Sequence, residues 1–189
     1  MKQHILPAIR LTVICLVVFA GLYTVLILGI AQFVPNKANG EKVMLKGRTV
    51  GYALEGQNFS EDKYFWSRPS AVGYNAAGSG GSNKGPSNPD YLKQVQDRID
   101  SFLVHNPGVK KSEIPSELVT ASGSGLDPDI SPVAAKLQVK RVAAARKINE
   151  ATVDELVTKN TKPAFLGLMG TETVNVLQLN IALDQMSAQ

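Results

Sequence analysis

Two glycine- and serine-rich stretches are the residues of this 189-residue chain best suited to hold a phosphate group. Backbone N–H groups of glycine-rich loops can surround phosphates, and residues 78–84 read Gly-Ser-Gly-Gly-Ser-Asn-Lys. A nucleotide-binding P-loop needs Gly-Lys-Ser/Thr, whereas Lys84 is followed by Gly85. The second stretch, Ser122–Gly125, lacks the strand–turn–helix context of a nucleophilic serine. Both stretches are therefore expected to be flexible surface loops.

Carboxylates and metal-ligating side chains are sparse. Asp127 and Asp129 flank a proline and offer oxygen ligands for a cation, but such a pair more often forms a turn. Cys15 is the only cysteine, and the two histidines, His4 and His105, lie far apart. The sequence therefore predicts no metal site, and no residue has an independent argument for catalysis.

An aromatic segment is the strongest candidate for a binding surface. Tyr64, Phe65, Trp66 and Arg68 lie within five residues, and large aromatics with arginine are enriched where protein interfaces bind most tightly. The alternative is that the aromatic rings pack beneath the long loop that follows them. The sequence alone leaves both interpretations open, and these four residues are kept as candidate subunit contacts.

Residues 11–34 contain no charged side chain, and 19 of these 24 residues are hydrophobic. A helix of this length spans about 36 Å, enough for a hydrocarbon core of about 30 Å. The run is too long for a cleavable signal peptide and lacks a small-x-small cleavage site. We therefore expect a retained transmembrane anchor. Its Gly21 and Gly29 are candidate contacts with other helices, because small residues let helices approach closely in lipid.

Charge alone does not orient the anchor, because lysines and arginines lie close to both of its ends. The short segment 1–10 before the anchor, and the long segment 35–189 after it, favour a cytoplasmic N-terminus with the main domain outside. A formal net charge of +4 is too small to indicate nucleic-acid binding.

The domain that follows the anchor is expected to be α+β, rich in helix, with a small β element. Alternating residues at 42–45 and 49–54 predict a β-hairpin. Glycine, serine and proline predict long loops at 67–90 and 120–132. Helix starts are predicted from capping residues and prolines at four places, namely Asn88-Pro89, Ser131-Pro132, Asn149 and Asn175.

Several strings together resemble the C subunit of the Kdp potassium-transporting ATPase, and they occur in that family's order. The resemblance runs from the anchor to the last residues. The strings are Tyr64-Phe65-Trp66-Ser67-Arg68-Pro69-Ser70, Ser79-Gly80-Gly81-Ser82-Asn83, Ser87-Asn88-Pro89, Glu117-Leu118-Val119-Thr120-Ala121-Ser122, Gly125-Leu126-Asp127-Pro128, Ile130-Ser131-Pro132, and Val174-Asn175-Val176-Leu177 continuing to Asp184.

The resemblance implies an accessory, non-catalytic subunit of a bacterial high-affinity potassium pump in the inner membrane. Its partners would be a channel-like, potassium-translocating subunit and a P-type, ATP-hydrolysing subunit, besides membrane lipid. The family's C subunit is described as an assembly factor and a catalytic chaperone that raises the ATP affinity of the P-type subunit. No cofactor is expected to bind firmly, and ATP is implied only through that partner. The competing hypothesis is an independent, signal-anchored envelope enzyme or binding protein.

Overall fold

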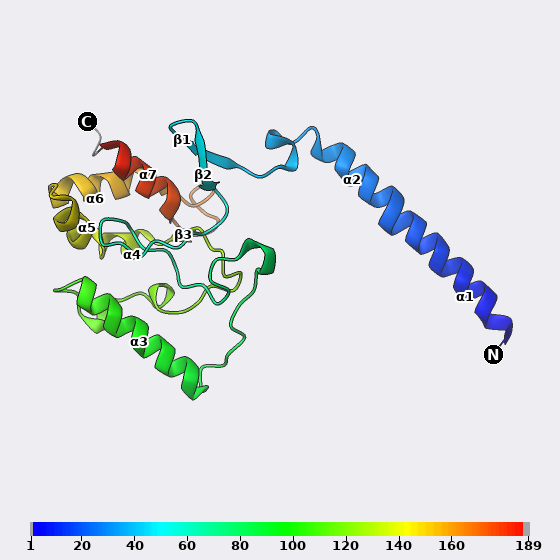
Figure 1. Ribbon diagram of the computed structural model, residues 1–189, viewed down its shortest axis with the longest axis horizontal. Coiled ribbons are helices and arrows are strands. Elements are labelled where there is room, and N and C mark those ends of the chain that lie inside the picture. Colours follow the sequence, from blue (N-terminus) through cyan, green and yellow to red (C-terminus); the bar gives the residue numbers. More distant parts are fainter. Residues whose placement is uncertain (1, 187–189) are drawn as a thin grey trace. The chain divides into compact units, whose positions relative to one another are not determined.

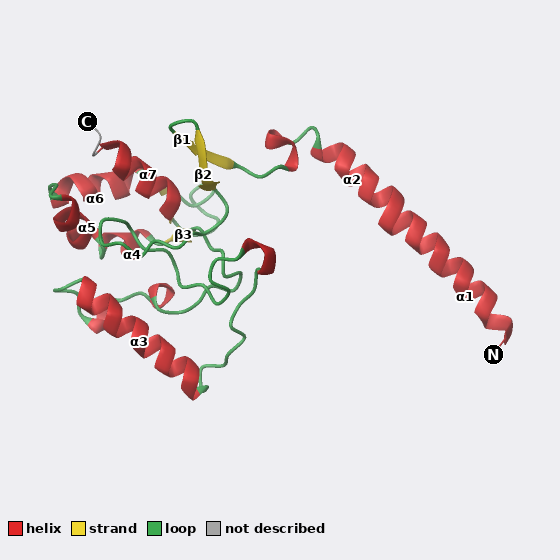
Figure 2. Cartoon of the chain, viewed as in Figure 1, coloured by secondary structure: helices red, strands yellow, loops and turns green. Residues whose placement is uncertain are grey.

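The computed structural model describes residues 2–186, and the chain divides into two compact units, residues 1–41 and 42–189. Mixed helix and sheet confirms the predicted α+β class (Figures 1 and 2). Five helices and two small sheets make up the described part of the second unit. Short 3-10 turns lie at Pro35–Ala38, Ala76–Gly78, Lys111–Glu113 and Ser116–Leu118.

The first unit is one long helical rod, formed by α1 (Lys2–Cys15), a π-helical turn (Leu16–Leu22) and α2 (Tyr23–Ala31). The helix Gln3–Ala31 is long and apolar enough to cross a membrane, and an 18-residue stretch within it has a mean hydropathy of 2.8. Helical structure begins at Lys2 and therefore includes the segment that was expected to be a short tail. α2 ends at Ala31, and the 3-10 turn that follows has Pro35 at its start, a position where proline's fixed φ and missing N–H are tolerated.

The predicted hairpin is present as β1 (Lys42–Leu45) and β2 (Arg48–Tyr52), paired antiparallel. Lys46 and Gly47 form its turn, and both have positive φ, at 50° and 78°. Two-residue turns of this kind match the twist of the strands they join. β2 ends two residues earlier than predicted.

The four predicted helix starts are confirmed, and each capping side chain accepts a backbone N–H. Asn88 caps α3 (Pro89–His105), Ser131 caps α4 (Pro132–Lys136), and Asn149 caps α6 (Glu150–Lys159). Asn175 Oδ1 accepts from the N–H of Gln178 at the start of α7 (Val176–Met186), at 3.0 Å. Such caps replace hydrogen bonds that the first turn of a helix cannot make internally.

The helix predicted to run on from Ser131 is divided into α4 and a second helix, α5 (Val139–Arg146). At the break, the N–H of Gln138 donates to the carbonyl of Ala135 instead of continuing the α-helical ladder. The break turns the Gln138 side chain into the interior of the domain, where it forms hydrogen bonds with Trp66 and Arg141.

A second sheet was not predicted. Its strands are β3 (Asp129–Ile130), β5 (Thr173–Asn175) and β4 (Thr161–Lys162), in that spatial order and all antiparallel. The core of the domain lies between this sheet and helices α4 to α7. Its fully buried side chains include Val142, Val153, Val157, Val174, Leu179 and Leu183.

The two loops expected at 67–90 and 120–132 are confirmed as largely irregular, and they are hydrogen-bonded to one another. The N–H of Gly80 donates to the carbonyl of Ser124 at 2.8 Å, and the hydroxyl of Ser70 donates to the carbonyl of Gly125 at 2.7 Å. Gly125 has φ of 69°, and a Cβ there would lie 2.8 Å from the carbonyl oxygen of Gly80. This close approach explains why glycine is needed at that point.

Candidate interface site around the aromatic segment

The backbone of the aromatic segment is held by two buried side-chain amides. Asn180 on α7 accepts from the N–H of Phe65 at 2.8 Å and donates to the carbonyl of the same residue at 3.0 Å. Gln138, between α4 and α5, does the same for Trp66, at 2.7 Å and 3.4 Å. Both amides thus replace the neighbouring strand that an extended segment would otherwise need.

Phe65 belongs to the interior, since its side chain has no exposed surface and lies in the main hydrophobic cluster. For this residue the packing interpretation holds. Tyr64 and Trp66 are only half buried, so part of each ring remains available at the surface. The segment therefore combines an internal anchor with two neighbouring aromatic rings that reach solvent.

Tyr64 is held by charged groups of α5 and α7. Its hydroxyl donates to the carboxylate of Asp184 at 3.1 Å, and the guanidinium of Arg146 lies 4.9 Å from the ring centre. Arg146 also forms an ion pair with Asp184 at 2.6 Å. Burial, and then the hydrogen bond to Asp184, raise the pKa of Tyr64, so it stays a neutral donor at physiological pH.

Trp66 forms the centre of a second cluster. The guanidinium of Arg141 lies 4.2 Å from its ring centre, in cation–π geometry, and the ring of His105 lies 4.9 Å away, edge-on. The indole N–H donates to the carbonyl of Glu61 at 3.2 Å. The ring orientation is therefore fixed on several sides.

Arg141 is a buried hub that the sequence did not reveal. Its Nε donates to Asn106 at 3.1 Å, its Nη2 to Gln138 at 2.7 Å, and its Nη1 to the carbonyls of Asp62 and Tyr64 at 2.8 and 3.0 Å. Burial lowers the pKa of Arg141 to about 10, whereas the nearby carboxylate of Asp62 acts to raise it. The guanidinium therefore stays charged at neutral pH and ties the aromatic segment to α3 and α5. A charged residue on the apolar face of a predicted helix is the only signal by which it could have been found.

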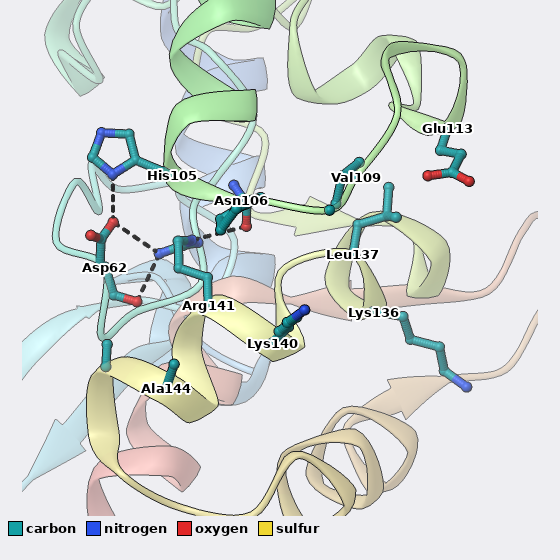
Figure 3. A pocket seen from close by; sticks show the side chains of 13 residues that line it. Asp62, His105, Asn106, Val109, Glu113, Lys136, Leu137, Lys140, Arg141 and Ala144 are labelled. Atoms are coloured by element: carbon teal, nitrogen blue, oxygen red, sulfur yellow. Dashed lines mark hydrogen bonds and ion pairs between the residues drawn. The ribbon is translucent and has the colours of Figure 1, made fainter.

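A pocket of about 510 Å³ opens beside this hub (Figure 3). In it, the Nδ1 atom of His105 lies 2.8 Å from the carboxylate of Asp62, which in turn lies 3.8 Å from Arg141. Its remaining charged lining residues are Glu113, Lys136 and Lys140. Among residues 2–186, no group of three or more His, Cys, Asp or Glu side chains could hold a metal ion. Four of the lining side chains, Asp62, His105, Asn106 and Arg141, are bound to one another or to backbone carbonyls. These contacts fix the shape of the surface at this end of the pocket.

Arg68 joins the aromatic segment to the second loop. Its guanidinium pairs with Asp127 at 2.7 Å, and its carbonyl accepts from the hydroxyl of Tyr74 at 2.7 Å. Asp127 also accepts from the N–H of Asp129 at 3.1 Å, the bond expected of a turn-forming aspartate. Burial raises the pKa of Asp129. Arg68 is about one-quarter exposed, and its main role here is to hold the loops.

Gly21 and Gly29 lie in the first unit, where a Cβ at either would meet no other atom. They are eight residues apart, and at 3.6 residues per turn this places them about 80° apart around an ideal α-helix. Gly21 lies inside the π-helical turn. The predicted interface residues therefore form two separate sets, one on each unit.

The chain is similar to known proteins over almost its whole length. The family model described as "KdpC: K+-transporting ATPase, c chain" matches residues 5–185. Proteins named potassium-transporting ATPase KdpC subunit are 56% identical in Flavobacterium psychrophilum and 53% identical in Flavobacterium johnsoniae, each covering 97% of this chain and 99% of the relative. The protein of that name in Bacteroides fragilis is 50% identical, over 97% of this chain and 98% of its own. The match spans both the apolar helix and the domain with the aromatic segment, and this chain therefore belongs to the family of C chains of K+-transporting ATPases.

Proposed function

We propose that this subunit is a non-catalytic accessory component of a high-affinity potassium uptake pump. The observation that carries the proposal is how the domain uses its strongest polar groups. Arg141, Gln138 and Asn180 all bind the chain's own backbone or one another, and they fix Tyr64 and Trp66 at the surface. A site whose polar groups are already hydrogen-bonded within the chain is suited to presenting a rigid contact surface to a partner.

The partners are a channel-like, potassium-translocating subunit and a P-type, ATP-hydrolysing subunit. The names of the relatives support a multi-subunit ATPase. The most apolar stretch of the helix Gln3–Ala31 is not buried by any other part of the described chain. This helix therefore needs lipid or other helices around it. The two glycines of this rod, Gly21 and Gly29, offer places for close helix contact.

The location proposed is the bacterial inner membrane, with the N-terminus in the cytoplasm and residues 42–189 outside. In this orientation the glycine- and serine-rich loops have no access to cytoplasmic ATP, and this chain holds no nucleotide itself. An increase in the ATP affinity of the P-type subunit would then pass through contacts between subunits, and couplings between sites typically change affinity about 5–150-fold.

Copurification tests the assembly role. The P-type subunit would be tagged and purified from cells with and without this chain, and recovery of the channel-like subunit would be measured with potassium-limited growth. We expect both to be reduced without the chain and restored by it. Gly85→Ala is the matched control, because a Cβ at Gly85 meets no other atom. A pump that assembles and supports growth without this chain would contradict the proposal.

A further inference from the structure

The tip of the hairpin between β4 and β5 presents large apolar side chains to solvent. Exposed fractions are 69% for Phe165, 76% for Leu166, 89% for Leu168 and 64% for Met169. No charged residue occurs from position 163 to position 171. Contiguous exposed apolar side chains of this kind mark contacts with proteins or membranes, whereas scattered single ones do not.

Part of the backbone of this tip is hydrogen-bonded within the tip itself. Phe165 and Met169 exchange hydrogen bonds in both directions, at 2.8 and 3.0 Å. The N–H groups of Gly167 and Leu168 donate to the carbonyls of Ala164 and Phe165, at 2.9 and 3.2 Å. Backbone polar groups must be paired internally where water is absent. Four of the seven N–H groups of residues 164–170 are thus paired within the tip. The others can be hydrated in the interfacial layer, which contains water, but not in the hydrocarbon core.

The conformation of the tip also points its apolar side chains outward. Leu166 has φ of 54°, a region that bulky L-residues seldom adopt, and Gly167 follows at 70°. A leucine in this position leaves its side chain 76% exposed. This cost is offset if the leucine is buried by something outside the chain.

We propose that residues 164–170 insert into the interfacial layer of the lipid bilayer that carries the chain's own anchor. The inference rests on Gln3–Ala31 spanning that bilayer. Only residues 32–41 separate the rod from β1, and ten extended residues reach at most about 35 Å. The domain is thus tethered near the membrane surface, which raises the effective concentration of the bilayer for the tip.

The chemistry of the tip fits lipid better than a protein partner. From position 164 to position 170 no side chain can donate or accept a conventional hydrogen bond, whereas protein interfaces usually include polar contacts that fix orientation. The charges at the base, Lys162 and Glu172, have opposite signs. Apolar area therefore drives insertion, with no requirement for anionic headgroups.

A spin label at position 168 tests the proposal in the full chain. Cys15 is the only cysteine, so Cys15→Ala gives a background for single labels at Leu168→Cys, Val104→Cys and Leu28→Cys. Each protein would be inserted into phosphatidylethanolamine vesicles with a minority of phosphatidylglycerol. Collision of the label with oxygen and with a water-soluble nickel chelate then reports its depth. Val104 on α3 is the matched control, because it is 77% exposed.

We expect the Leu168 label to collide with nickel about tenfold less often than the Val104 label, and to resemble the Leu28 label in its preference for oxygen. Salt of about 1 M should not change this, because it screens charge but not apolar burial. Nickel access equal to that of the Val104 label would overturn the proposal. In that case a Leu28 label that still prefers oxygen would show that the anchor helix itself is inserted in the bilayer. Shielding from both reagents that appears only with the other pump subunits would also overturn it, in favour of a protein contact.

Discussion

Replacing Arg141 with methionine should destabilise the domain, because the guanidinium is the shared donor of the aromatic segment. The oxygens of Asn106 and of the Asp62 and Tyr64 backbone would lose their Arg141 donor. The Gln138 oxygen would lose one of two donors, because it also accepts from the N–H of Trp66. An unsatisfied buried acceptor costs about 1–3 kcal/mol. Since the adjoining pocket is lined by Arg141, water can reach part of this site. We therefore expect a net loss of about 3–5 kcal/mol, the range for breaking a buried charged group's contacts.

The assay is denaturant unfolding of the full chain in mild detergent, followed by the fluorescence of Trp66. This residue is the only tryptophan, and its ring lies 4.2 Å from the Arg141 guanidinium. Lys140→Met is the matched control, because Lys140 is the preceding residue of the same helix and is exposed. Its stability should change by less than about 0.5 kcal/mol.

Arg141→Lys should recover only part of the loss, because an ammonium group cannot supply the planar fork of donors that reaches three directions. A change in stability for Arg141→Met no larger than that for Lys140→Met would show that the guanidinium does not hold the segment. An unchanged midpoint with an altered fluorescence spectrum would mean that the guanidinium affects the ring without holding the segment.

Three further substitutions test the loops and the anchor. Gly125→Ala should lower the free energy of unfolding by about 1–3 kcal/mol, because its Cβ would meet the carbonyl oxygen of Gly80 at φ of 69°; a melt indistinguishable from that of Gly85→Ala would contradict this. Tyr74→Phe should cost about 1 kcal/mol at neutral pH through its lost bond to the Arg68 carbonyl. Burial raises the pKa of Tyr74 above 10.0, so its contribution is present below pH 10 and is lost as the pH rises through the folded pKa; unfolding curves of the phenylalanine variant should accordingly depend less on pH above 10. Gly21→Leu should reduce copurification of the pump subunits while leaving membrane insertion intact, and unchanged copurification would remove Gly21 from the interface.

Local signals explain why the helix starts and the β1–β2 hairpin could be predicted. The caps at Asn88, Ser131 and Asn149 depend on residues within three positions of the helix, and the hairpin depends on a two-residue turn. The β3–β5–β4 sheet could not be found, because its strands have two or three residues and β3 pairs with a partner more than 40 positions away. Strands this short carry no alternation that a pattern can detect.

The residues that organise the site were missed for a related reason. Gln138 and Asn180 are single polar residues within helical stretches, where a solvent-facing position is the usual expectation. Their role appears only when the backbone of Phe65 and Trp66 is placed against them, more than 70 residues away. The aromatic segment itself was recognised from composition, but composition did not separate the buried Phe65 from its half-exposed neighbours.

The most direct test of the accessory role is the ATP dependence of potassium-stimulated hydrolysis by the pump. The other two subunits would be purified and assayed at saturating potassium, with and without added chain, and the KM for ATP determined. We expect a KM about 5–150-fold lower when the chain is present, together with no hydrolysis by the chain alone. An identical KM with and without the chain, in preparations where it is shown to be bound, would contradict the account.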